Sequence, residues 1–461
     1  MNKEEKNSNK CPICGRPIHK ESKYCIFHAV AEEKTEKEFR KALKEYINEI
    51  KEKKKDFNFK RFIFIGDINF RKDLNISTFK YADFGGATFK RNTYFRDVTF
   101  KGNAYFGGTT FGVNTEFVGV TFEGYADFGV ASFGISVKFG VTTFEEYAEF
   151  VGTNFGVNTE FVGVTFEEYA DFVGATFRFV SFENTTLPPG MKLDLKVKKE
   201  GIILFKHTLL ENVFLNLDLD ECVLIDFTDA LLRNTKIRKD QIENHILQEK
   251  KKEFFKAREV YLLLKNNFHS IGRYNDESWA FKKEKDMERL SYSFYPYKEV
   301  RTKIKFLNKK WRKQRFLILK WMCTRDFKKW ILSLFSNLIY GYGERPQNVI
   351  FSAGIIIFIF ALLFSLIGIG NPEIIELKGT AILQNSGNIV DLASEGFLKN
   401  NPIRNFPDSL YFSTITFTTL GYGDFRPLEG WGRIFAGSEA FIGAFMMALF
   451  IYTFARRTGG R

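Results

Sequence analysis

FVGVTFEGYAD at residues 117–127 and FVGVTFEEYAD at residues 161–171 are two nearly identical copies of an eleven-residue unit. Between Phe89 and Phe177 phenylalanine recurs at spacings that alternate between six and five residues. The recurring residues are Phe79, Phe84, Phe89, Phe95, Phe100, Phe106, Phe111, Phe117, Phe122, Phe128, Phe133, Phe139, Phe144, Phe150, Phe155, Phe161, Phe166, Phe172, Phe177 and Phe182. A repeat this regular predicts a solenoid, in which each unit stacks on the one before it.

The composition of the unit favours β-structure. Eleven residues can also define a right-handed helical supercoil, but Gly, Thr, Val and Phe are poor helix formers. The segment resembles the pentapeptide-repeat proteins, in a looser, Phe-centred variety with one residue inserted per two faces. The resemblance implies a right-handed quadrilateral β-helix.

Four faces of that β-helix would take 22 residues per coil, so the phenylalanine ladder predicts about five coils, each rising roughly 4.8 Å. The phenylalanines would stack as a dry internal column, and small residues would face inward with them. Such small residues are Ala126, Ala148 and Ala170. Weaker coils are expected from Phe59 onward and, after a break at Pro188-Pro189-Gly190, from Leu193 to Leu232.

The charged residues between 103 and 185 of this predicted rod are mostly acidic. The acids recur because the unit recurs, so they indicate a solvated face rather than paired acid and base catalysts. We therefore expect no enzymatic activity. Pentapeptide-repeat proteins include DNA-mimicking topoisomerase inhibitors, but the membrane features below favour another function, and we expect no nucleic-acid partner.

A second informative stretch is TTLGYGD at residues 418–424. A dehydrated cation that crosses a membrane needs oxygens in place of its water shell, and backbone carbonyls aimed at one axis supply them when four chains meet. Gly421 and Gly423 can adopt φ > 0, which lets alternate peptide units turn inward. The predicted filter, typical of potassium selectivity, uses the carbonyls of Thr419, Leu420, Gly421 and Tyr422, with the Thr419 hydroxyl as the innermost ligand.

The neighbours of this stretch distinguish it from a simple turn. Before it lies PDSLYFSTITF at residues 407–417, a short amphipathic helix, and after it come Trp431-Gly432-Arg433 and an apolar span. A second Gly-Tyr-Gly at residues 341–343 runs directly into Arg345-Pro346, so there we expect a helix stop.

Residues 345–457 resemble the two-transmembrane potassium channels. The resemblance implies a homotetramer with K+ as the permeant ion. It assigns Asp424 as the acid at the filter mouth, Trp431 and Arg433 as outer anchors, and Gly443 as the gating hinge.

The chain also departs from that family. Leu420 stands where the family has Val or Ile, and Tyr411 and Phe412 replace the tryptophans around the filter. One alternative is therefore a poorly selective cation channel. Another is a membrane-anchored interaction scaffold with a vestigial pore, which the intact Gly421-Tyr422-Gly423-Asp424 argues against.

Two apolar spans flank the filter. Residues 349–369 contain no charge, residues 434–455 contain only Glu439, and each span can cross the hydrocarbon core at about 1.5 Å per residue. Arg345 precedes the first span, and the loop between the spans carries more acids than bases. The residues that follow the second span include Arg456, Arg457 and Arg461. This charge pattern predicts a multi-pass protein of the cell membrane with both termini cytoplasmic.

Glu439 allows two interpretations. An acid inside a membrane span is a functional candidate by default. The favoured interpretation is a neutral carboxyl bonded to a pore-helix hydroxyl such as that of Thr414 or Thr416. The alternative is a charge that permeating ions encounter.

The N-terminus carries a predicted metal site. Cys11, Cys14, Cys25 and His28 form two pairs with two-residue spacing, which is typical of a closed tetrahedral structural zinc site. His19 could replace His28, and incidental or redox cysteines remain an alternative. Five cysteines, three of them within fifteen residues, argue against a disulfide framework.

The chain of 461 residues, with a net charge of +13, is therefore predicted to be a multidomain membrane protein. The predicted segments are a zinc knuckle at 1–28, a charged helix at 29–56, the β-helix at 57–235, a tetratricopeptide-like helical hairpin at 239–300, a basic Trp-rich juxtamembrane segment with an interfacial helix at 301–346, and the two-transmembrane channel domain at 347–461. Within the last of these we place the spans at 349–369 and 434–455, the pore helix at 408–418 and the filter at 419–424. An unidentified cytoplasmic ligand or protein is the expected partner of the β-helix.

The helical segments carry further expectations. The apolar face of the charged helix, formed by Phe39, Leu43, Tyr46, Ile47 and Ile50, fits either a solvated linker or a packing or oligomer contact. The hairpin is expected to pair 250–268 with 277–292. Its expected core is Tyr261, Leu264, Phe268, Trp279 and Phe281. In the basic segment, Trp311, Trp321 and Trp330 lie among Lys and Arg, which is typical of a membrane interface, and the interfacial helix is expected at 328–340.

Overall fold

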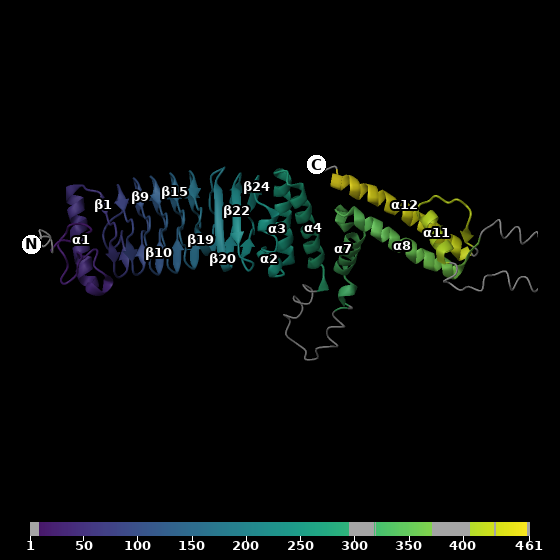
Figure 1. The fold of residues 1–461 in the computed structure, drawn as a ribbon, viewed down its shortest axis with the longest axis horizontal. Coiled ribbons are helices and arrows are strands. Elements are labelled where there is room, and N and C mark those ends of the chain that lie inside the picture. Colours follow the sequence, from purple (N-terminus) through teal and green to yellow (C-terminus); the bar gives the residue numbers. More distant parts are fainter. Residues whose placement is uncertain (1–8, 295–317, 319, 371–405, 428–429, 459–461) are drawn as a thin grey trace, which may run out of the picture. The chain divides into compact units, whose positions relative to one another are not determined.

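The structure is a computed structural model. It describes residues 9–294, 318, 320–370, 406–427 and 430–458. The chain divides into two compact units, Met1–Met287 and Glu288–Arg461. Figure 1 labels the elements of each.

The first unit begins with the cysteine-rich knuckle, η1 (Ala31–Glu33) and α1 (Glu36–Lys53). A capping box starts α1, because the Thr35 hydroxyl accepts from the Glu38 backbone N–H and the Glu38 carboxylate accepts from the Thr35 N–H. The buried residues of α1 are Phe39, Leu43, Tyr46, Ile47 and Ile50, which is the predicted apolar face. Phe39 meets Phe64 of the first coil edge-on at 5.7 Å between ring centroids. The charged helix is therefore a packing element that covers the first coil.

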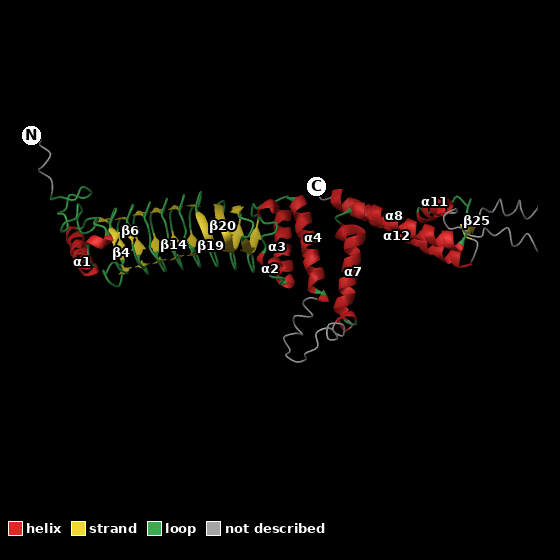
Figure 2. Cartoon of the chain, turned by 60° about the horizontal axis from the view of Figure 1, so that its bottom comes forward, coloured by secondary structure: helices red, strands yellow, loops and turns green. Residues whose placement is uncertain are grey.

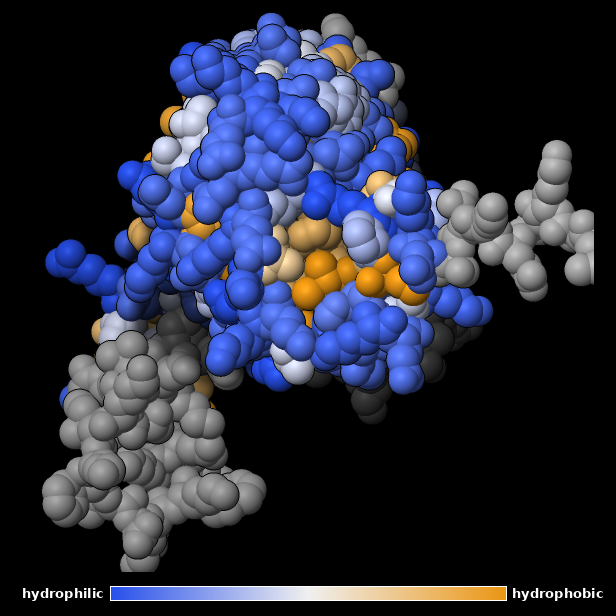
Figure 3. Space-filling view, turned by 90° about the vertical axis from the view of Figure 1, so that its left-hand side faces the viewer, coloured by the Kyte–Doolittle hydropathy of each residue, from blue (hydrophilic) through white to orange (hydrophobic). Residues whose placement is uncertain are grey.

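Viewed from its N-terminal end, this unit presents mostly hydrophilic side chains, with a smaller apolar area in a central hollow (Figure 3). The sheets of a solenoid end in rows of unpaired backbone groups, which are a template for association. A helix over the first coil, with a charged outer face, covers such an edge.

Behind this cap the chain winds as a parallel β-solenoid with four faces. The first face holds β1 (Phe57–Asn58), β5 (Ala82–Asp83), β9 (Ala104–Tyr105), β12 (Ala126–Asp127), β15 (Ala148–Glu149) and β18 (Ala170–Asp171). The second holds β2 (Ile63–Phe64) and β6 (Thr88–Phe89), continued by single bridges at Thr110, Ser132, Asn154 and Thr176. The third holds β3 (Ile68–Asn69), β7 (Thr93–Tyr94), β10 (Asn114–Glu116), β13 (Ser136–Lys138), β16 (Asn158–Glu160) and β19 (Thr176–Ser181). The fourth holds β4 (Thr78–Phe79), β8 (Thr99–Phe100), β11 (Thr121–Phe122), β14 (Thr143–Phe144) and β17 (Thr165–Phe166). Partners such as Ala104 and Ala126 lie 22 residues apart, as the repeat predicts.

Phenylalanine fills the interior of the solenoid in four columns, one behind each face, where the sequence predicted a single column. Rings in one column are parallel, as for Phe106 and Phe128, whose centroids are 4.8 Å apart. Rings from opposite faces meet edge to face, as for Phe117 and Phe128, at 88°. Both geometries are favourable for aromatic pairs, and each buried ring contributes roughly 1.5–3 kcal/mol through burial.

Two further features bind one coil to the next. Buried threonine hydroxyls reach across coils, as where Thr109 Oγ1 donates to Phe84 O and Thr153 Oγ1 donates to Phe128 O, each at 2.7 Å. At one corner of the solenoid a Cβ on Gly134 would lie 1.6 Å from Gly112 O. Only glycine fits there, because consecutive backbones touch.

After residues 188–190 the coils continue with leucine in place of phenylalanine. β20 (Lys192–Leu204) pairs with β19, and β22 (Phe214–Leu219) and β23 (Leu224–Asp226) pair with β20. β21 (Leu209–Glu211) pairs with β24 (Leu231–Arg233). Leu193 lies opposite Leu215, so the 22-residue register persists through the predicted weaker coils.

Helices close the other end of the solenoid (Figure 2). They are η2 (Lys239–Gln241), α2 (Leu247–Lys250), α3 (Phe254–Ser270) and α4 (Tyr274–Ser291). The Asn267 side chain, 1% exposed, accepts from Thr235 N and donates to Thr235 O, so its amide replaces a next strand at the sheet edge. The prediction that the first hairpin helix spans residues 250–268 is wrong at its start, because residues 251–253 are not helical and separate α2 from α3.

The hairpin core differs in part from the prediction. Tyr261, Leu264 and Phe268 are fully buried. Trp279 is half-buried and meets Tyr261 edge-on at 5.6 Å. Phe281 is also half-buried, and the Lys265 ammonium lies 5.6 Å from its ring centroid. The long side chain of Lys265 thus covers part of the Phe281 ring, which the packing of the hairpin leaves half-exposed.

The second unit contains the helices expected near and within the membrane. They are α7 (Arg325–Tyr340), η3 (Gly341–Gly343), α8 (Pro346–Ile367), α11 (Phe406–Phe417) and α12 (Gly430–Thr458), with a short pairing of β25 (Ile369–Gly370) and β26 (Arg426–Pro427). α8 and α12 are long and apolar enough to span a membrane. α7 ends at Gly341, whose φ is +56°, so the predicted helix stop is confirmed. Residues 301–317 and 319 of the predicted basic segment, including Trp311, lie outside the described residues.

Candidate functional site

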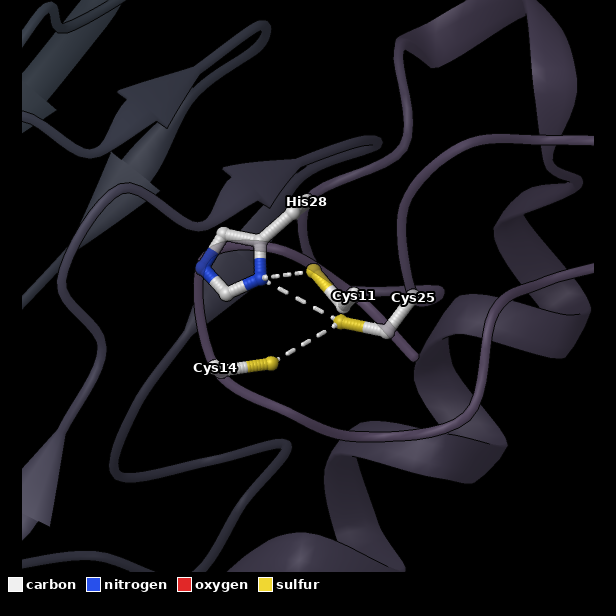
Figure 4. Close-up of side chains that lie close together, drawn as sticks. All are labelled: Cys11, Cys14, Cys25 and His28. Atoms are coloured by element: carbon white, nitrogen blue, oxygen red, sulfur yellow. Dashed lines mark hydrogen bonds between the residues drawn. The ribbon is translucent and has the colours of Figure 1, made fainter. Parts of the chain in front are cut away.

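The knuckle brings the four predicted metal ligands together. Gly15, with φ +70°, lets the chain turn after Cys14 so that the Gly15 N–H donates to Cys11 O. The second pair closes a similar turn, where the N–H groups of His28 and Ala29 donate to Cys25 O. The ligand atoms of Cys11, Cys14, Cys25 and His28 all lie within 4.8 Å of one another (Figure 4).

Distances within this cluster suit one tetrahedral ion. His28 Nδ1 lies 3.2 Å from Cys25 Sγ and 3.6 Å from Cys11 Sγ, and the Sγ atoms of Cys14 and Cys25 are 3.5 Å apart. Ligands about 2.0–2.3 Å from a tetrahedral ion are separated by roughly 3.5–3.8 Å. The Cys3His cluster could therefore hold a metal ion. His19 lies outside the cluster, with its Nε2 4.0 Å from the Glu38 carboxylate.

A backbone carbonyl beside the cluster determines which ring nitrogen of His28 carries the hydrogen. His28 Nε2 lies 3.1 Å from Lys60 O, so this nitrogen donates to the carbonyl and leaves Nδ1 for a metal. Burial lowers the pKa of His28 and raises the pKa of Cys14 to about 12. Without a metal, burial thus opposes the thiolate form of Cys14, and a bound cation would favour it.

Nearby, Lys34 ties the knuckle to the first coil. Its buried ammonium donates to Ile26 O at 2.8 Å and to Ile63 O at 2.7 Å. Burial lowers the pKa of Lys34 to about 7. A lysine ammonium beside a Cys3His cluster is also well placed to balance thiolate charge.

The predicted filter follows a short helix that packs between two long ones. α11 contacts both α8 and α12, and Phe412 meets Phe364 edge-on at 4.9 Å. Phe412, which stands where the channel family has tryptophan, therefore packs against the first apolar helix. The filter begins where α11 ends.

Backbone geometry in the filter matches the prediction for both glycines. Gly421 has φ +51° and Gly423 has φ +82°. No described atom lies within 4 Å of a Cβ built on either residue, so φ rather than space makes glycine necessary. Thr419 also has φ +58°, which the sequence analysis did not predict and which is unfavourable by roughly 1–2 kcal/mol for a residue with a Cβ. Strained backbone of this kind concentrates at functional sites.

The first filter residues are held by the end of α11. Thr419 N donates to Thr416 O at 3.0 Å and Leu420 N donates to Ile415 O at 2.9 Å. These bonds satisfy carbonyls that a helix terminus leaves free. Beyond them the side chains of Leu420 and Tyr422 are 59% and 69% exposed in the single chain.

Gly443 lies where the last residue of α11 meets α12. A Cβ on Gly443 would lie 1.9 Å from Phe417 O, so no other residue fits without movement. Around this contact pack Val349 of α8 and Met446 of α12. α12 runs as one helix from Gly430 to Thr458, and the hinge role implied by resemblance stays a prediction.

Glu439, the acid in the second apolar helix, is fully buried. Its Oε1 is hydrogen-bonded to Ser413 Oγ. The predicted partner type, a hydroxyl of the pore helix, is right, but the predicted residues Thr414 and Thr416 are wrong. Because 3.6 residues make one helical turn, Ser413 faces α12 and Thr414 points elsewhere on α11.

Comparison with known families agrees with this arrangement. Residues 379–459 match a family described as Ion channel, and residues 84–132 match Pentapeptide repeats (9 copies). The chain joins a pentapeptide-repeat solenoid to an ion channel domain. No curated protein and no solved structure matches it. Families of these two kinds are in general not enzymes, and an ion channel domain with two apolar helices indicates a membrane protein.

Sequence reasoning missed two residues of the channel domain. Ser413 was passed over because one serine in a helix of serines and threonines carries no special signal, although its spacing to the buried face of α11 could have identified it. Glu344 was likewise passed over, and it forms an ion pair with Arg456 at 3.2 Å near the end of α12.

Metal analysis of purified protein tests the cluster. We expect one tetrahedrally bound metal ion per chain, and its loss in Cys25→Ser, because three ligands cannot close the site. His19→Ala is the matched control and should retain the ion. A wild-type protein without bound metal would contradict the assignment.

Paired glycine substitutions in α12 test the close contact with α11. Gly443→Ala should lower the stability of the channel domain, because its Cβ meets a backbone carbonyl, whereas a Cβ on Gly437 meets no described atom within 4 Å. We expect Gly437→Ala to behave like the wild type and Gly443→Ala to lose about 1–3 kcal/mol of stability per chain through overpacking. Thermal unfolding in detergent and current recordings measure both, and equal behaviour of the two variants would refute the contact.

Proposed function

We propose that this protein is a subunit of a potassium-selective channel whose cytoplasmic N-terminal solenoid regulates a homotetrameric pore. The observation that carries the proposal is the pair of left-handed glycines, Gly421 and Gly423, directly after a helix wedged between two apolar helices. Alternating φ signs turn successive carbonyls toward one side, which is what a dehydrated cation requires. The filter ligands are Thr419, Leu420, Gly421 and Tyr422, and Asp424 lies at the mouth.

The tetramer is supported by what one chain leaves uncovered. Leu420 and Tyr422 are largely exposed, and one filter loop surrounds only a quarter of an ion. Fourfold association would bring four such loops to one axis. In this assembly Gly443 serves as the gating hinge of α12.

The basic residues at the ends of the apolar helices support an orientation in which both termini are cytoplasmic. Arg345 lies just before α8, and Arg456 and Arg457 lie in the last turns of α12. Basic residues flank membrane helices on the cytoplasmic side. The N-terminal unit is then cytoplasmic, where thiols stay reduced and can bind zinc. We propose Zn2+ as the structural ion of the Cys3His cluster, because mixed thiolate and imidazole ligands in a closed tetrahedral set favour it.

Regulation is supported by a set of contacts that we call the Tyr342 junction, formed by Arg289, Ser333, Tyr342, Glu344 and Arg456. The Tyr342 hydroxyl accepts from Arg289 Nε at 3.3 Å and lies 3.0 Å from Ser333 Oγ. Tyr342 O accepts from Arg456 Nη1 at 3.5 Å, and Arg456 also pairs with Glu344.

Four segments of the second unit therefore meet at the Tyr342 junction. They are the end of α4, α7 with Ser333, the turn between α7 and α8, and the cytoplasmic end of α12. A ligand or protein that binds the N-terminal unit would act on the pore through this junction if it binds the closed and open states with different affinity, typically by 1–3 kcal/mol.

Reversal potentials test the filter. Purified wild-type protein in bilayers with opposed potassium and sodium gradients should show a potential near that for potassium. Gly421→Ala or Gly423→Ala should abolish selectivity, because a Cβ at φ > 0 is unfavourable by about 1 kcal/mol or more in each of four subunits. Unchanged selectivity in either variant would refute the filter, and wild-type protein that passes sodium equally well would identify a poorly selective cation channel.

Tyr342→Phe tests the junction. This change removes the hydroxyl that meets Arg289 and Ser333 and keeps the ring and the carbonyl. Deletion of residues 1–239 should alter open probability in the wild type, and Tyr342→Phe should reduce that effect about fivefold or more, because the coupling passes through the lost bonds. Single-channel recordings of the four combinations measure this.

The matched control is Ser336→Ala, whose hydroxyl bonds only to Leu332 O within α7 in the described structure. It should leave the effect of the deletion unchanged. Fully additive effects of Tyr342→Phe and the deletion would show that the junction does not carry the coupling.

A further inference from the structure

One serine of the pore helix contacts both apolar helices. Ser413 Oγ is hydrogen-bonded to Glu439 Oε1 of α12 and lies 2.9 Å from Ile357 O of α8. Ser413 and Glu439 are both fully buried. The three helices of the channel domain are therefore joined at one hydroxyl, behind the filter.

The hydrogen bonds of this hydroxyl determine whether the carboxyl group of Glu439 is protonated. Ile357 O is a carbonyl and can only accept, so the single hydrogen of Ser413 must be donated to it if that bond forms. The bond between Ser413 Oγ and Glu439 Oε1 then needs a second hydrogen. Only the carboxyl can supply it.

We propose that Glu439 carries a proton and donates it to Ser413 Oγ, while Ser413 donates to Ile357 O. The neutral acid is thus a positioning residue, which fixes α11, and with it the filter, between α8 and α12. The inference deepens the proposed function, because it assigns a role in holding the pore and not in contacting the ion.

Two further atoms fit a neutral acid. Glu439 Oε2 and Ser409 Oγ are buried and have no hydrogen-bond partner among the described residues. Ser409 precedes Ser413 by four residues, so it lies about 6 Å away along the same face of α11. A water between Ser409 and Glu439 Oε2 would satisfy both atoms. An ionised carboxylate with one unpartnered oxygen would instead be strongly unfavourable at this depth.

The rival interpretation is an ionised Glu439 that attracts permeating cations. It predicts that neutralising the residue lowers cation current. Protonated Glu439 predicts that the current is retained, because glutamine has the same shape and its amide N–H can replace the acid proton toward Ser413.

Infrared difference spectroscopy of the full-length wild-type channel and Glu439→Gln at neutral pH tests the proton directly. We expect a carboxylic-acid C=O band in the wild type that is absent from the variant. In Ser413→Ala this band should move to higher frequency, since the acid loses its acceptor. Ser438→Ala, on the adjacent exposed position of α12, is the control and should leave the band in place.

Current recordings give the second measurement. Glu439→Gln should keep conduction within about twofold of the wild type, whereas Ser413→Ala should reduce it about tenfold, as expected for loss of a bond to a buried polar group. An absent acid band, a band that Ser413→Ala leaves unmoved, or a large loss of current in Glu439→Gln would each overturn the proposal. The infrared result does not depend on which ion the pore conducts, so failure of the inference can be told from failure of the proposed function.

Discussion

The position of α11 between α8 and α12 is the constraint on which the channel domain depends. The proposed filter is a loop, and a loop keeps its shape only where its ends are fixed. Here one end is the C-terminus of α11, whose carbonyls accept from Thr419 and Leu420. Close backbone contact at Gly443 and the bond between Ser413 and Glu439 hold α11 against α12, and Ser413 Oγ also contacts Ile357 O of α8. Apolar packing alone is non-directional, so the hydrogen-bonded acid is what can specify the register of these helices.

The solenoid has a different requirement, since its stability comes from contacts between consecutive coils. Each coil is too small to bury its phenylalanines alone, and neighbours complete their burial. The cost of such a design is two exposed sheet ends. Here α1 and the cysteine-rich knuckle cover the first coil, and Asn267 with α2 and α3 closes the last. A metal site is well suited to this position, because it orders a short segment that could not bury a core of its own.

Much of this structure follows from the sequence because it is periodic or sterically restricted. The 22-residue register, the helix stop at Gly341, the left-handed glycines of the filter and the clustering of Cys11, Cys14, Cys25 and His28 were all predictable. The predictions that failed depend on the direction of side chains in three dimensions. A count of phenylalanines cannot tell one column from four, and helical spacing alone did not show that Ser413, and neither Thr414 nor Thr416, faces Glu439. The positive φ of Thr419 has no local sequence signal, since surrounding structure imposes it.

The two Gly-Tyr-Gly segments show how context determines the use of one tripeptide. Gly341 and Gly343 have φ of +56° and +92°, and Gly421 and Gly423 have φ of +51° and +82°, so the glycines of both segments adopt left-handed backbone. The tyrosines differ. Tyr342 is buried, and its hydroxyl is satisfied within the chain by Arg289 and Ser333, which makes the first segment a fixed junction between helices. Tyr422 is 69% exposed in the single chain. An exposed large aromatic side chain between two left-handed glycines is consistent with the proposed association of several chains around this segment, which would cover the ring.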